Sequence, residues 1–352
     1  MKRNKNYLAR LVVLLVVSFC FIGWSATPPF ALAQSHQEKW PDALLMEGMS
    51  VGSSAYMVAA AFCSAIREQL GIRTQTTAGV PLPVMTARVG SGESQLGYTI
   101  SELPYDAFRG LHGWKGRQLK DLRILSHVVY VSYHFITWPG TGVKSIGDLK
   151  GKTVMGDQGG VRTTGEVTRS FLAANGLSGD DVKIVTWREW GEQVSFVRMK
   201  LGHAINFETV VGTAPVAELD RSIKWNFVPL KKNEIESAIR KIPYIIPYTI
   251  PVGSYTQVPE PYLTVAYSVG LTINSKVPDS LAYELCKVLY DKPGRFVNVH
   301  PLWGKFDINS ATVSRTAPFH AGTIKYYKEK GVWNPELDGW QKGVLREVGL
   351  EK

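Results

Sequence analysis

The sequence predicts an α/β fold with two lobes, and three observations lead to this prediction. Short apolar segments alternate with amphipathic segments along the chain, which is the rhythm of a parallel sheet with crossover helices. Several of the amphipathic segments end at glycine, as helices commonly do. The 319 residues that follow a leader of 33 residues are enough for two lobes of ~150 residues each.

The leader has the composition of an export signal. A basic start without acidic residues precedes the apolar run LVVLLVVSFCFIGW, and Ala31-Leu32-Ala33 provides a small-residue cleavage site. We therefore expect export to the periplasm, with cleavage after Ala33 and a mature chain that begins at Gln34. A retained membrane anchor is the alternative, but fourteen apolar residues are short for a span, which needs ~20.

The charge balance and the motif content argue against several classes of function. After the leader, 36 Lys and Arg accompany 30 Asp and Glu, and the basic residues are spread along the chain rather than clustered as in nucleic-acid-binding proteins. The seven histidines lack metal-binding spacing, and no nucleophile elbow occurs. We therefore expect a protein that is not an enzyme and needs no nucleic acid, metal or cofactor.

The first lobe is expected to begin with residues 34–137. Within it, a helix begins at Ser53 or Ser54 and ends at Gly71, where start and stop signals flank an apolar pattern. The expected strands are 43–49, 72–77, 95–100 and 122–138, and the expected helices are 54–70, 83–92 and 103–110.

Residues 138–261 have the pattern of the second lobe, and residues 262–352 complete the first. The second lobe should hold strands 153–156, 182–187, 204–207, 225–230 and 244–250, with helices 164–175, 189–201 and 213–218. The last part should hold strand 262–273 and helices 280–291, 294–300 and 318–330. We expect a ligand cleft between the lobes, at the carboxyl ends of the strands.

Two cysteines remain after the leader, Cys63 and Cys286, and both fall in helical segments. An oxidising compartment permits a disulfide between them. A single pair is not a disulfide framework, so we expect two buried free thiols.

The stretch GDQGGVRTTGEV, residues 156–167, is the clearest candidate for an anion site. Its glycines let backbone amides approach a ligand, and the N-terminus of the following helix favours a negative charge. Thr163 and Glu166 have the spacing of a capping box, Thr164 follows, and the planar fork of Arg162 fits a carboxylate. The alternative is a capped helix with a solvated Arg162. The motifs of phosphate loops and dinucleotide sites are absent.

Other candidate residues follow strands at the same expected edge of the sheet. Each has an ordinary alternative as a helix cap, a loop residue or a core aromatic. They are Ser53, Ser54 and Tyr56 at the start of a helix, Gly79 and Ser101 after two strands, Trp190 at a strand-to-helix junction and Glu208 after strand 204–207.

Five stretches occur in one order across residues 43–331: VGSSAYMVAAAFCSAI, GSGESQLGYTISELPYDAFRG, IGDLKGKTVMGDQGGVRTTGEVTRSFLAANGL, IPVGSYTQVPEPYLTVAYSVGLTI and PFHAGTIKYYKEKG. Together they resemble the TAXI-type solute-binding proteins of TRAP transporters, the ATP-independent periplasmic uptake systems. The resemblance implies a two-lobed periplasmic binding fold, type II-like, that closes over a small organic anion. It also implies delivery of that ligand to an integral-membrane TRAP permease driven by an ion gradient.

The chain departs from the family pattern at the expected site. Apolar residues replace the usual serine and asparagine in 78–84, Glu102 replaces an aspartate, and Arg162 enters the opening loop. We therefore expect a carboxylate with a less polar tail, paired with Arg162. A ligand-sensing subunit and the binding protein of an ATP-driven system are the alternatives; an enzyme on the same fold would need a catalytic motif that is not found.

Overall fold

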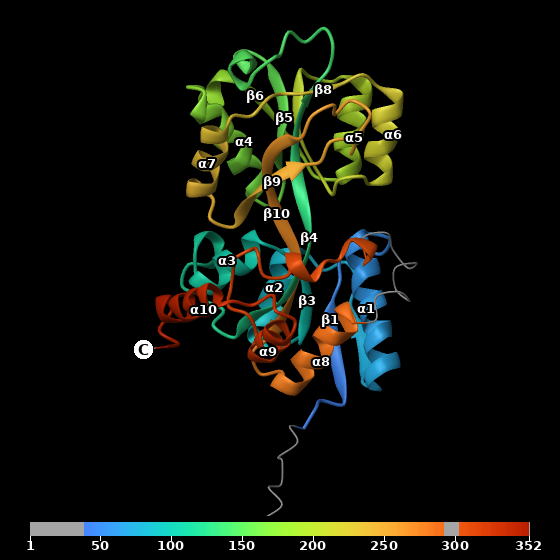
Figure 1. Cartoon of the computed structure of the whole chain (residues 1–352), viewed down its shortest axis with the longest axis vertical. Helices are drawn as coiled ribbons and strands as arrows, with labels where there is room; N and C mark the ends of the chain where they lie inside the picture. Colours follow the sequence, from blue (N-terminus) through green and yellow to red (C-terminus); the bar gives the residue numbers. More distant parts are fainter. Residues whose placement is uncertain (1–38, 292–302, 352) are drawn as a thin grey trace, which may run out of the picture. The chain divides into compact units, whose positions relative to one another are not determined.

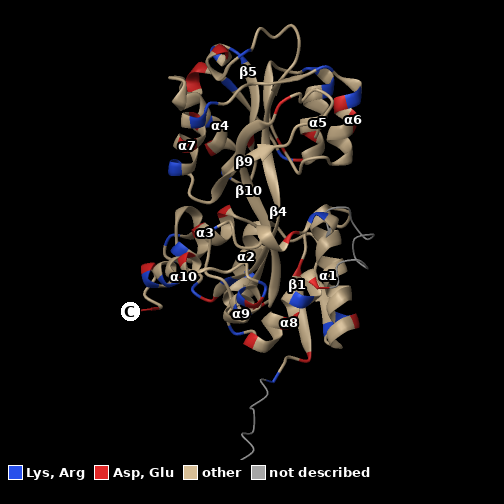
Figure 2. Ribbon diagram, in the orientation of Figure 1, with Lys and Arg blue, Asp and Glu red and all other residues tan. Residues whose placement is uncertain are grey.

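The computed structural model describes residues 39–291 and 303–351 (Figure 1). The expected export signal, its cleavage site after Ala33 and the expected helix 294–300 lie outside these residues. Within them, no helix combines the length and the apolar character that a membrane span requires. Basic and acidic residues are interspersed along the helices (Figure 2).

The described strands belong to one sheet, which is mixed rather than parallel as expected. Its order is β2-β1-β3-β10-β4-β7-β5-β6, with β8 paired to β4 and β9 to β10. Pairing is parallel at both ends of the sheet and antiparallel where β10 and β4 meet each other and their outer neighbours. The strands are β1 (Ala43–Glu47), β2 (Arg73–Thr76), β3 (Leu96–Ile100), β4 (Leu122–Thr137), β5 (Thr153–Gln158), β6 (Lys183–Trp187), β7 (Ala204–Thr209), β8 (Asn226–Phe227), β9 (Ile245–Ile250) and β10 (Tyr262–Asn274).

The helices form two groups around the two parallel parts of the sheet (Figure 1). We call β1–β3 with α1, α2, α3, α8, α9 and α10 lobe I, and β5–β7 with α4, α5, α6 and α7 lobe II. The α/β class expected from the sequence is confirmed. The helices are α1 (Ser54–Leu70), α2 (Leu82–Ser91), α3 (Glu102–Arg109), α4 (Thr163–Ala174), α5 (Trp190–Met199), α6 (Ala214–Ser222), α7 (Lys232–Lys241), α8 (Asp279–Tyr290), α9 (Ala321–Glu329) and α10 (Pro335–Glu347).

The long strands β4 and β10 belong to both lobes. Strand β4 pairs with β10 over residues 122–132 and with β7 over 132–137. Strand β10 pairs with β9 over 262–267 and with β3 over 269–273. Nearly every residue of both strands is buried, which explains their continuous apolar sequence. The expected β-rich stretches 122–138 and 262–273 therefore form one antiparallel pair at the centre of the sheet.

Local signals predict several helices correctly, but two helices of the structure, α7 and α10, are not among the predicted ones. Helix α1 begins after Ser53, whose side chain accepts a hydrogen bond from the Tyr56 amide at 3.1 Å, and ends at Gly71 with φ of 70°. Helix α10 was not predicted, although its N-cap Asn334 precedes a proline as in many helix starts. Its residues Leu337 and Val344 pack into the core of lobe I.

The expectation of two buried free thiols is confirmed. Cys63 lies on α1 and Cys286 on α8, and each is unpaired and about 99% or more shielded from solvent. Burial raises the pKa of the Cys286 thiol to about 12, so this side chain stays protonated. Both thiols act as small apolar groups in the core of lobe I.

The contact between α8 and α9 gives a stability prediction. A Cβ on Gly322 would lie 1.9 Å from the carbonyl oxygen of Asp279, so neither backbone can stay in place. We expect Gly322→Ala to lower the free energy of unfolding by about 1–3 kcal/mol in urea denaturation. Gly339→Ala is the matched control, because a Cβ there meets nothing within 4 Å and alanine favours helix. Equal stability of the two variants would contradict the close packing.

Candidate functional site

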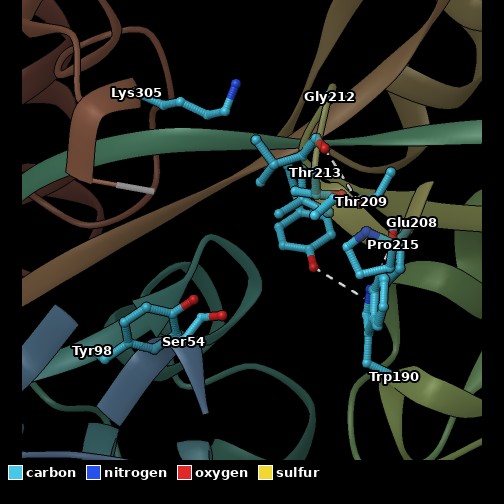
Figure 3. A pocket seen from close by; sticks show the side chains of 13 residues that line it. Ser54, Tyr98, Trp190, Glu208, Thr209, Gly212, Thr213, Pro215 and Lys305 are labelled. Atoms are coloured by element: carbon cyan, nitrogen blue, oxygen red, sulfur yellow. Dashed lines mark hydrogen bonds between the residues drawn. The ribbon is translucent and has the colours of Figure 1, made fainter. Parts of the chain in front are cut away.

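The described residues enclose a cavity of about 650 Å³, which lies within the usual range of small-ligand sites. Its walls come from both lobes and from the strands they share (Figure 3). Lobe I contributes Ser54 at the start of α1 and Tyr98 on β3; lobe II contributes Trp190, the end of β7 and the loop into α6. Val131 of β4 and Tyr267 of β10 complete the wall between them.

Three aromatic side chains of the described residues line this cavity, and specific contacts hold two of them. The Trp190 indole donates a hydrogen bond to the carbonyl oxygen of Glu208 at 3.2 Å and packs edge-on against Phe207. The Tyr267 ring lies 5.8 Å from that of Tyr133. Together with Tyr98, these side chains provide apolar faces for the body of a ligand.

Glu208 is a buried carboxylate in the wall of the cavity. It is 4% exposed and accepts a hydrogen bond from the Thr164 hydroxyl at 2.6 Å and a longer one from Tyr267 at 3.5 Å. Burial raises its pKa to about 7, although these hydrogen bonds oppose the shift. Within the described residues no cation lies in ion-pair range of Glu208.

Lys305 brings a positive charge to the same cavity from a short 3-10 helix, η5 (Trp303–Lys305). Its ammonium lies 3.9 Å from the place where a Cβ of residue 212 would sit, so it reaches the loop before α6. Figure 3 shows the side chain extending towards Gly212 and Thr213. The cavity therefore has a lysine on one wall and a buried carboxylate on another.

The residues predicted for the site are distributed between this cavity and its surroundings. Three of them line the cavity: Ser54, Trp190 and Glu208. Thr164 is not a lining residue, but its hydroxyl donates a hydrogen bond to Glu208. The remaining ones have structural contacts. Ser53 caps α1, Tyr56 packs beside Gly48, Gly79 turns the chain with φ of 74° and Ser101 accepts from the Ser268 amide.

The anion at the N-terminus of α4 is a carboxylate of the protein itself. Glu102, the first residue of α3, accepts hydrogen bonds from the amides of Arg162 and Thr163, both at 2.9 Å, and from the Thr163 hydroxyl at 2.6 Å. This carboxylate occupies the position that the opening loop offers to an anion. Because α3 lies in lobe I and α4 in lobe II, the contact joins the two lobes.

Arg162 is likewise engaged by protein carboxylates. Its guanidinium pairs with Asp106 and Glu166 and lies 3.5 Å from Glu102. It lines a second cavity of about 390 Å³ beside His112, separate in its lining from the larger one. Arg162 is not among the described residues that line the 650 Å³ cavity.

The expected capping box between Thr163 and Glu166 is not formed. Helix α4 starts one residue earlier than predicted, with Arg162 at its N-cap and Thr163 as its first residue. The Thr163 hydroxyl therefore donates to Glu102, while Glu166 accepts from Arg162 and from the Tyr244 hydroxyl.

Most side chains that line the cavity are not among the residues predicted for the site, and four of them carry polar groups of interest: Tyr98, Tyr267, Lys305 and Thr209. Tyr98 and Tyr267 lie inside strands, where an aromatic residue is ordinary, and Lys305 is one of many dispersed lysines. Thr209 directly follows Glu208, and its hydroxyl lies 2.9 Å from that of Thr213. Of these four residues, only Thr209 has a local signal in the sequence, because it lies at the end of β7.

Residues 48–331 match the NMT1-like family. The chain belongs to this family. The match spans both lobes and includes every element that lines the cavity.

Three solved structures illustrate the general likeness. The periplasmic aliphatic sulphonate binding protein SsuA from Escherichia coli is 12% identical, with 88% of this chain and 89% of that chain covered and a TM-score of 0.45. Lactococcal OpuAC, complexed with glycine betaine, is 12% identical over 85% and 99% of the chains, with a TM-score of 0.44. The substrate binding protein of an amino acid ABC transporter is 12% identical over 74% and 98%, with a TM-score of 0.38. At these scores the ligand has to be argued from the residues of this chain.

Replacing Glu208 should change the pH dependence of stability. Since its pKa rises from 4.5 to about 7 on folding, protonation stabilises the native state below pH 4.5, and this contribution is lost as pH rises through 7. We expect Glu208→Gln to match the wild type at pH 4.5 and to exceed it by about 2–3 kcal/mol at pH 8 in urea unfolding. The exposed Glu236→Gln should differ little at either pH. A Glu208→Gln gain that is the same at both pH values would contradict the burial argument.

Glu102 gives a second prediction. An alanine there leaves the amides of Arg162 and Thr163 and the Thr163 hydroxyl without their acceptor. Burial raises the pKa of the Glu102 carboxyl while these hydrogen bonds oppose the shift, so the hydrogen bonds, rather than the charge alone, are what the substitution removes. We expect Glu102→Ala to lower the free energy of unfolding by about 1–3 kcal/mol in urea denaturation at pH 7. The control is Glu93→Ala, which removes an exposed ion pair with Arg88 and should have an effect below about 0.5 kcal/mol. If the two variants were equally stable, the Glu102 carboxylate would not hold the helix.

Proposed function

We propose that this protein is a solute-binding receptor that captures a small organic acid in the 650 Å³ cavity. The observation that carries the proposal is the construction of that cavity. Its walls come from both lobes, are mostly aromatic or aliphatic, and include Lys305, whose ammonium reaches Gly212, together with Thr209 and Thr213. Such a site can surround a small solute and fix its orientation by a few polar groups.

Lys305 takes the role that the sequence suggested for Arg162. An ammonium is a strong partner for a carboxylate, and the hydroxyls of Thr209 and Thr213 lie on the same side of the cavity. Helix α6 also starts at this wall, which favours a negative charge there. We assign Arg162 to the contact with Glu102 and place it outside direct ligand contact.

The proposed mechanism is closure of the lobes around the solute. The first lobe, residues 34–137 with 262–352, moves relative to the second lobe, residues 138–261. The two lobes are joined through β4 and β10. Ligand contacts to Ser54 or Lys305 on one side and to residues 208–213 on the other exist together only in the closed form. A ligand that binds this form better shifts the equilibrium towards it. The contact of Glu102 with α4 adds stability to the same form.

We further propose export to the periplasm and delivery of the ligand to an integral-membrane TRAP permease. The order of the five TAXI-like stretches supports this partner. A binding protein of an ATP-driven system is the alternative, and a ligand-sensing subunit is another. Uptake of a labelled acid by cells that carry the protein with its permease distinguishes the transport systems. Dissipation of the ion gradient abolishes uptake by a TRAP system. Depletion of ATP with the gradient intact abolishes uptake by an ATP-driven system.

A panel of small acids tests the binding function. We expect at least one aliphatic or aromatic monocarboxylate or amino acid to raise the melting temperature, because a ligand at 100 times its Kd stabilises by ~2.7 kcal/mol. Lys305→Ala should weaken its binding by about 1.5–3 kcal/mol in titration calorimetry. The exposed Lys115→Ala serves as the control and should bind like the wild type. The absence of a shift with every acid would overturn the function, and unchanged affinity of Lys305→Ala would remove this lysine from the site.

A further inference from the structure

Glu208 has bonding capacity that the fold does not use. A carboxylate can accept about four hydrogen bonds, and the part of the chain that the structure describes supplies two, from Thr164 and Tyr267. The group lines the cavity, yet it is shielded from bulk water. A buried charge is costly unless it is paired, so an unpaired carboxylate in a ligand cavity indicates a group that the ligand brings.

The groups around Glu208 do not neutralise it. Tyr267 on β10 and Thr164 on α4 donate to it; Tyr98 on β3 and Tyr133 on β4 lie close enough for Glu208 to help raise their pKa above the ordinary value. These tyrosines stay uncharged at neutral pH. Among the described residues that line the cavity, the basic one is Lys305. No ion pair between Lys305 and Glu208 is found within the described part of the chain.

We propose that Glu208 forms a binding subsite for an ammonium group and that the ligand is a small zwitterion. This inference rests on the proposed function, because Lys305 binds the carboxylate of the same ligand. The apolar body of the ligand then lies against Tyr98, Trp190 and Tyr267. Aromatic faces also favour a nearby cation, which adds to the attraction at this end of the cavity.

The sign of the pH dependence separates this ligand from a plain acid. An ammonium binds the ionised form of Glu208, so affinity for a zwitterion rises as pH increases from 6 to 8. A plain acid whose carboxylate approached Glu208 would need the protonated form, so its affinity would fall over the same range. The pKa of about 7 places both changes in an accessible window.

Ligands with matched skeletons test the inference. L-Leucine is compared with 4-methylpentanoate, which lacks the amine, and with 3-methylbutylamine, which lacks the carboxylate; L-phenylalanine is compared with 3-phenylpropanoate and 2-phenylethylamine. In calorimetry with the wild-type protein, we expect the amino acid of at least one set to bind tenfold or more tightly than both of its partners. Its affinity should rise from pH 6 to pH 8.

Glu208→Gln provides the matched variant. It should weaken binding of that amino acid at least tenfold at pH 8 and leave the amine-free acid unchanged or tighter. An amine-free acid that binds as tightly as the amino acid, with affinity that falls as pH rises, would overturn the ammonium subsite and leave the acid-binding function in place. If no acid with or without an amine binds, the proposed function itself is wrong.

Discussion

The antiparallel pairing of β4 with β10 is the constraint on which the rest of the structure depends. Each strand is hydrogen-bonded in lobe I along one part and in lobe II along another. The two parallel parts of the sheet therefore share a continuous centre. Val131 and Tyr267, which lie on these strands, form part of the cavity wall, so the same pairing that joins the lobes also positions the site.

The Glu102 carboxylate provides a further contact between the lobes, and it explains why the position expected for a ligand carboxylate is already filled. It satisfies the N-terminus of α4 and lies beside Arg162, which also pairs with Asp106 and Glu166. A helix N-terminus and an arginine suit a ligand carboxylate equally well as a protein carboxylate. In this chain a protein carboxylate fills the position, because Glu102, about 60 residues before Arg162, lies against the N-terminus of α4.

Sequence reasoning succeeded where the signal was local. The caps of α1, the burial of the thiols and the placement of Ser54, Trp190 and Glu208 at ends of strands or starts of helices follow from neighbouring residues. It failed where pairing over long distances decides the outcome. The antiparallel centre of the sheet, the role of Glu102 and the position of Lys305 depend on contacts between residues far apart in the chain. Helices α7 and α10 are the exceptions, since neither was predicted although the Asn-Pro start of α10 is a local signal.

The most direct test is a crystal structure with the acid that gives the largest thermal stabilisation. The account predicts the ligand inside the 650 Å³ cavity, with its carboxylate within hydrogen-bond distance of the Lys305 ammonium and its body against Trp190 and Tyr267. The contact between Glu102 and α4 should remain. A ligand carboxylate bound to Arg162 in place of Glu102, or a ligand outside the cavity, would contradict the assignment of the site.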